Sequence, residues 1–177
     1  MKKESTHDRD PLRPGTMSNT LIRNLVGNYR QNHMSAIKNS MGIDDAHSIW
    51  FDLPKLKRFI SMIEEEAGKI NPETTEEDLG IRFYYAAYPK AENWDIMATH
   101  PVDREYAEKH TLVMIPTLKR TSETGESLHY DFNPLSGNGE VMAMTQKSRG
   151  LDDSDDIGIG ENSGQLIPPQ DSIVELF

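Results

Sequence analysis

The chain has 177 residues, no cysteine and a formal net charge of −10, from 29 acidic and 19 basic residues. Without cysteine it can form no disulfide, zinc–thiolate site or iron–sulfur cluster, and it has no thiol nucleophile. Because no apolar signal segment follows Lys2 and Lys3, and no run reaches transmembrane length, we expect a single-domain cytoplasmic protein.

The acidic balance argues against nucleic acid and membranes as partners. Nucleic-acid binding needs a positive surface that displaces counterions, and anionic membranes attract basic segments. The basic cluster that stands out is Lys55, Lys57 and Arg58, which we interpret as the solvated face of a helix. We therefore expect neither kind of partner.

Residues 1–16 are polar, contain two prolines and a glycine, and are predicted to be disordered; the chain fits a start at either Met1 or Met17. After them, an apolar or aromatic residue recurs about every four positions from Leu21 to Met41. This spacing predicts one long amphipathic helix over residues 18–41. Such a helix is long for a small domain, so we expect it to pack on a sheet or to pair with another chain.

A strand over 46–51 is predicted next, followed by a helix that Asp52 caps and that Gly68 ends. An acidic connection then leads to the clearest strand, residues 80–88, in which Ile81 and Phe83 alternate with Arg82 and Tyr84.

Two further strands, 110–118 and 127–133, are joined by the polar turn 119–126 and form a predicted β-hairpin. The fold class is therefore α+β, in a domain spanning 17–149. We expect a mixed β-sheet of about four strands, made of a βαβ unit and a β-hairpin, with helices on one face and a long N-terminal helix.

The last part of the chain is predicted to be a mobile acidic, glycine-rich loop, 150–164, followed by a segment, 165–177, that docks on the domain. Its glycine run, 158–164, is one residue longer than the dinucleotide-binding fingerprint and follows an acidic stretch. The aspartates in 152–156 do not have the spacing of a calcium loop. We therefore expect no cofactor.

Arg82 is the first candidate for ligand binding. It shares a strand face with Tyr84 and Tyr88, and Trp94 lies in the loop that follows. If that face lines a cleft, the guanidinium could hold a carboxylate or phosphate through two parallel hydrogen bonds. The alternative is a structural ion pair with an acid such as Asp45, Asp52 or Asp131.

A weak metal candidate comes from the predicted hairpin. His129 and Asp131 project from one face of its second strand, and a symmetric turn would bring His110 near them. Two imidazoles and a carboxylate can bind zinc or iron. The same residues are also ordinary on a solvent-facing strand, so we expect no metal.

Four stretches, HSIWFDLPKLKRFI, LGIRFYYAAYP, HTLVMIPT and NSGQLIPPQ, resemble a group of small bacterial proteins of unknown function. That group has SxWF, GxRxYxAxYP and TxVMxPT strand patterns and a closing glycine-plus-PP segment. The resemblance covers roughly residues 20–120 and 162–169. It implies a shared fold, and it implies that an arginine usually stands at the position of Arg82. The residue before the PP pair is often cysteine in the group, and Ile167 stands there in this chain, so no thiol chemistry carries over.

Together these patterns favour a non-enzymatic domain that binds a protein partner, or a second copy of itself, through helix 18–41. The alternative is a small-molecule binder or an enzyme without a recognisable motif, with its site near Arg82. The sequence names neither a ligand nor a reaction.

Overall fold

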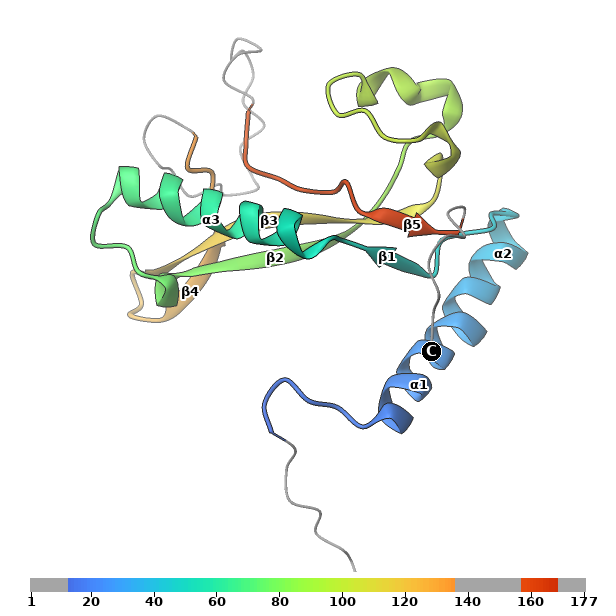
Figure 1. Cartoon of the computed structure of the whole chain (residues 1–177), viewed down its shortest axis with the longest axis horizontal. Helices are drawn as coiled ribbons and strands as arrows, with labels where there is room; N and C mark the ends of the chain where they lie inside the picture. The colour runs from blue at the N-terminus through green and yellow to red at the C-terminus, as the bar shows by residue number, and fades with distance from the viewer. Residues whose placement is uncertain (1–12, 136–156, 169–177) are drawn as a thin grey trace, which may run out of the picture. The chain divides into compact units, whose positions relative to one another are not determined.

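The computed structural model describes residues 13–135 and 157–168, which fall into two units (Figure 1). One unit contains the N-terminal helix and extends to Gly42, and the other, the body, begins at Ile43. Several predictions lie outside the described residues: the disorder of 1–12, the mobility of 150–156 and the docking of 169–177.

The first unit contains one continuous helix of 23 residues. It consists of α1 (Asn19–Asn28), a π-helical turn (Tyr29–Met34) and α2 (Ser35–Met41). The side chain of Ser18 accepts a hydrogen bond from the Leu21 N–H at 3.2 Å and caps the first turn. At the other end Gly42 takes the left-handed conformation, with φ 71°, that ends helices. The predicted long helix is confirmed.

The π-helical turn keeps the apolar stripe of this helix on one face. Leu21, Leu25 and Tyr29 follow one another at steps of four, but the next apolar residue after Tyr29 is Met34, five residues on. In a regular α-helix that step would carry Met34 away from the stripe. Bonding from i to i+5 widens the turn and brings Met34 back towards the face of Tyr29.

The body contains two antiparallel sheets. The larger has the order β2 (Leu79–Ala87), β3 (His110–Thr121) and β4 (Ser127–Asp131). The smaller pairs β1 (Ser48–Trp50) with β5 (Gln165–Ile167). The mixture of helices and strands and the β3–β4 hairpin are as predicted.

The predicted single mixed sheet with a βαβ unit is wrong. β1 does not join β2 but pairs antiparallel with β5, and β2 pairs antiparallel with β3. β1 is only three residues long, and all three pair with the equally short β5. Segments this short show no periodicity, so the sequence pattern could not mark β5 as a strand.

Helix α3 (Leu53–Ile70) packs on one face of the larger sheet (Figure 1). Asp52 caps it by accepting a hydrogen bond from the Lys55 N–H at 2.7 Å. Phe59 and Ile63, one turn apart, are buried with Met114 of β3. The helix continues past Gly68, where the sequence predicts its end.

A second core cluster joins the smaller sheet to the loop between β2 and β3. Tyr88, Tyr106, Ala46 and Leu166 are buried together, and Tyr106 accepts a hydrogen bond from the Leu166 N–H at 3.2 Å. The loop forms two 3₁₀ segments, η3 (Ala91–Met97) and η4 (Arg104–Tyr106), and a third, η2 (Glu76–Asp78), precedes β2.

Residues 157–164, part of the segment predicted to be mobile, lie along the edge of β3. Glu161 and Met114 exchange backbone hydrogen bonds at 2.9 and 3.1 Å, and Ile159 is buried in the α3 core cluster. This part of the chain is therefore an integral part of the body.

Gly164 gives a direct test of how closely this last segment packs. A Cβ there would lie 2.4 Å from Ile49 Cγ2 and 2.6 Å from Phe51 Cζ, so Gly164→Ala should destabilise the body by about 1–3 kcal/mol. Gly68→Ala is the control, because a Cβ meets nothing within 4 Å in α3 and should stabilise the helix by about 1 kcal/mol. Urea unfolding measures both, and a Gly164→Ala chain as stable as the native one would contradict this packing.

Candidate functional site

Arg82 and Tyr84 lie on the face of β2 that points away from α3, and both bind the carboxylate of Asp131. Arg82 Nη1 donates to one oxygen of Asp131 and the Tyr84 hydroxyl donates to the other. Arg82 Nη2 also donates to the His129 carbonyl at 2.8 Å. Hydrogen bonding with Tyr84 and the charge of Asp131 raise the pKa of Arg82. The guanidinium is thus held in a structural ion pair, the alternative considered above.

A cavity of about 270 Å³ lies beside this pair. Tyr84 and Asp131 form part of its wall, and Asn133 forms another part. Asn133 is itself satisfied, because its Nδ2 donates to the Ile157 carbonyl at 2.9 Å and its Oδ1 accepts from the Leu135 N–H at 3.2 Å. The rest of the wall is mostly apolar: Val113, Ile115, Phe132 and Ile159.

Tyr88 and Trp94 belong to a different place, the core cluster of the smaller sheet. The Tyr88 ring lies 6.1 Å from the Trp94 ring and 5.7 Å from the Tyr106 ring, and its hydroxyl donates to the Asn162 carbonyl at 3.1 Å. Burial raises the pKa of Tyr88. The four residues suggested as a ligand site therefore form two separate groups, Arg82 with Tyr84 and Tyr88 with Trp94.

The three metal candidates are not brought together. His110 pairs with Ala87 at the first residue of β3, whereas His129 pairs with Lys119 near the other end of that strand. Asp131 is engaged with Arg82 and Tyr84. Within residues 13–135 and 157–168, no group of three or more His, Cys, Asp or Glu side chains is placed to hold a metal ion.

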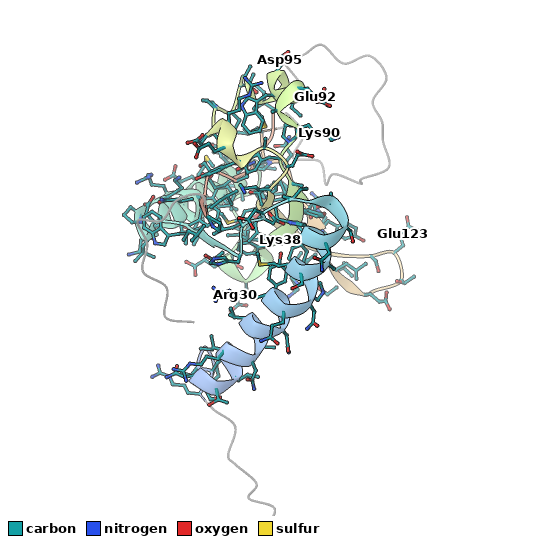
Figure 2. All side chains as sticks on the ribbon, turned by 90° about the vertical axis from the view of Figure 1, so that its right-hand side faces the viewer. Arg30, Lys38, Lys90, Glu92, Asp95 and Glu123 are labelled. Carbon is teal, nitrogen blue, oxygen red and sulfur yellow. The ribbon has the colours of Figure 1, made fainter. Side chains whose placement is uncertain are left out.

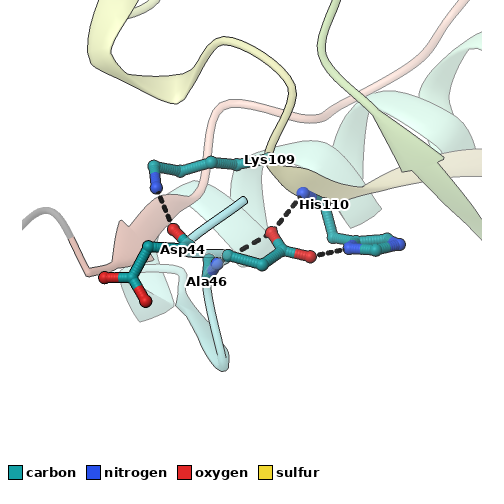
Figure 3. A network of polar contacts seen from close by, with 5 residues as sticks. Asp44, Ala46, Lys109 and His110 are labelled. Atoms are coloured by element: carbon teal, nitrogen blue, oxygen red, sulfur yellow. Dashed lines mark hydrogen bonds and ion pairs between the residues drawn. The ribbon is translucent and has the colours of Figure 1, made fainter. Parts of the chain in front are cut away.

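His110 instead binds Asp45, a buried carboxylate that takes three hydrogen bonds (Figure 3). One oxygen accepts the backbone N–H groups of Ala46 at 2.8 Å and His110 at 2.7 Å, and the other contacts His110 Nδ1. Next to this pair, Lys109 Nζ donates to the Asp44 carbonyl. The contacts fix residues 44–46 to the start of β3 and orient the half-exposed imidazole.

Replacing Asp45 should therefore loosen the body. Asp45→Ala leaves the buried backbone N–H groups of Ala46 and His110 without their acceptor, and should cost about 1–3 kcal/mol. Asp95→Ala is the matched control: Asp95 is exposed on the loop between β2 and β3, so the same change there should stay within about 0.5 kcal/mol. Urea unfolding compares them, and equal stabilities would show that Asp45 is not an anchor.

The N-terminal helix carries a charge pattern that the net charge of the chain conceals. From residue 11 to residue 43 there is no Asp or Glu, while Arg13, Arg23, Arg30 and Lys38 are basic. The total of −10 thus divides into +4 on this segment and −14 on the rest. This corrects the interpretation that basic residues cluster only around 55–58. Counting charges segment by segment would have found it.

The same helix combines its cations with exposed apolar side chains. Leu21 and Leu25 are 46% and 52% exposed, and no residue of α1, the π turn or α2 is buried. Figure 2 shows Arg30 and Lys38 on this helix and the acidic Glu92, Asp95 and Glu123 on the body. The helix is a basic amphipathic surface attached to an acidic chain.

Comparisons with protein-family models, curated proteins and solved structures found no match to this chain. Among the described residues, none of the helices has the length and hydropathy required to cross a bilayer. The resemblance to small bacterial proteins stays a prediction.

Proposed function

We propose that this chain is a non-enzymatic cytoplasmic module that binds a protein through its N-terminal helix. The observation that carries the proposal is the 23-residue amphipathic helix, with exposed leucines, no buried residue and no acidic residue. Amphipathic helices of this type bind by laying their apolar face into an apolar groove of a partner. The cations around the stripe favour a groove with an acidic rim.

The charge of the rest of the chain favours a protein partner over a membrane surface. A basic amphipathic helix alone can lie on an anionic bilayer. Here the other residues together carry −14, and an anionic surface would repel them. A partner protein with a local acidic groove attracts the basic helix without presenting an extended anionic surface that repels the rest of the chain.

The proposal is tested by replacing Leu21 and Leu25 with glutamate. Both substitutions place charge on the apolar stripe, so the double variant should lose its partner. The control is Asn24→Glu with Gln31→Glu, which adds the same charge at exposed polar positions of the helix. Untagged chain purified gently from its own cells is measured by native mass spectrometry.

The native chain and the control should appear in a complex, as a multiple of 20.1 kDa or together with a second protein. The Leu21, Leu25 variant should appear as a monomer. A complex that survives the stripe substitutions would contradict the proposal. So would a monomeric native chain that instead sediments with anionic vesicles through the same two leucines.

The cavity beside Tyr84 supports a second candidate function, binding of a small molecule near Arg82. The wall groups Tyr84, Asp131 and Asn133 are already hydrogen-bonded, so the surface that stays open is mainly apolar. A small apolar ligand fits that surface best, because it needs no further polar partner.

Val113→Phe tests this second candidate, because the larger ring should fill much of the cavity. Native mass spectrometry of the wild-type chain should show a small discrete mass increment that denaturation removes, and the variant should lack it. An unliganded wild-type chain, or the same increment in the variant, would exclude the cavity as the site.

A further inference from the structure

The body carries a groove with the chemistry that the helix requires, between α3 and the start of β2. Its floor is formed by Ile60, Ile63, Leu79 and Ile81, around a cavity of about 280 Å³. Ile60 is exposed although it is apolar. We call this surface the α3–β2 groove.

The apolar floor continues along β2 beyond the cavity. Phe83 and Tyr85 follow Ile81 on the same face of the strand and are 53% and 93% exposed. From Leu79 to Tyr85 the row is roughly 20 Å long at about 3.3 Å per residue. β2 is also an edge strand, and no strand within residues 13–135 and 157–168 pairs with its outer side. The surface is therefore long enough to hold several turns of a helix.

Two carboxylates lie at the rim of this groove. Glu64 of α3 and Glu76 of η2 line it directly. Over residues 57–81 there are seven acidic and three basic side chains, and one of the three, Lys69, is bound to Glu66 at 2.5 Å. The groove thus has an apolar floor and an acidic rim, whereas the helix has an apolar stripe and basic flanks.

We propose that the α3–β2 groove binds helix 19–41 of a second copy of this chain. Leu21, Leu25 and their neighbours on the stripe cover the apolar floor, while Arg30 and Lys38, each four residues from Met34, approach the glutamates of the rim. The inference rests on the proposed function and names its partner. Since exposed ion pairs contribute little free energy, the apolar contact supplies most of the affinity and the charges select the partner.

Every copy of the chain carries both the helix and the groove, so two copies can make the contact twice, as symmetric dimers do. Only residues 42–44 separate the end of α2 from Asp45, which is bonded to the first residue of β3. Short connections of this kind favour exchange of an element between copies.

Charge reversal tests the groove. In sedimentation velocity, Glu64→Lys with Glu76→Lys should weaken self-association of the full chain by at least about tenfold, because like charges then face each other. Glu92→Lys with Glu123→Lys makes the same change in net charge at exposed positions outside the groove lining, and should leave the association within about twofold. Circular dichroism checks that each variant is folded.

Mixing two variants tests the partner. Arg30→Glu with Lys38→Glu places acidic side chains of the helix against the acidic rim, and the Glu64, Glu76 variant places a basic helix against a basic rim. Each variant alone should self-associate at least about tenfold more weakly than the native chain. In an equimolar mixture both helix–groove contacts become complementary, so a heterodimer should form with near-native affinity.

The outcomes separate this inference from the proposed function. If the two groove lysines leave self-association intact while glutamates at Leu21 and Leu25 abolish it, the helix binds another surface and the groove assignment is overturned. If the wild-type chain is monomeric at every concentration, the second copy is not the partner. If mixing restores nothing, the charges of the helix and of the groove do not face each other, and the groove assignment is again overturned. In that case, native mass spectrometry of the chain purified from its own cells still tests the proposed function independently.

Discussion

The body depends on β3, because every other segment of the larger sheet is bonded to this strand. β2 pairs with it over nine residues on one side, and β4 pairs with it on the other. Beyond β4 the same edge is continued by Phe132, which donates to Pro116, and by Glu161, which pairs with Met114. Met114 is completely buried where these segments meet α3. Asp45 attaches the segment that follows the N-terminal helix to this strand, because its carboxylate accepts a hydrogen bond from the His110 N–H.

Using both edges of β3 leaves the outer edge of β2 at the margin of the sheet. The apolar row from Leu79 to Tyr85 runs along this strand, and Glu64 of α3 and Glu76 of η2 line the groove at its start. The cations of residues 11–43, by contrast, are gathered on the helix. Apolar surface of this kind marks an interaction site in a folded protein, and the opposite charges indicate which two surfaces fit.

The sequence predicts well those elements that depend on a pattern repeated over many residues. The long helix, its caps at Ser18 and Gly42, and the β3–β4 hairpin follow from periodicity and turn chemistry. The pairing of β1 with β5 could not be predicted, because three residues carry no period and their partner is more than a hundred residues away. The ion pair of Arg82 with Asp131 was one of several pairings that the sequence allowed, and residue types alone could not select it. The Asp45 carboxylate is an anchor only through a tertiary contact, which no sequence pattern marks.

The most direct test of helix-to-groove association is hydrogen–deuterium exchange of the full chain at dilute and concentrated conditions. Our account predicts that amides in residues 19–41 and 60–85 exchange more slowly as the concentration rises, while those around Asp45 and His110 do not change. Equal exchange at all concentrations, or slowing confined to other segments, would contradict it.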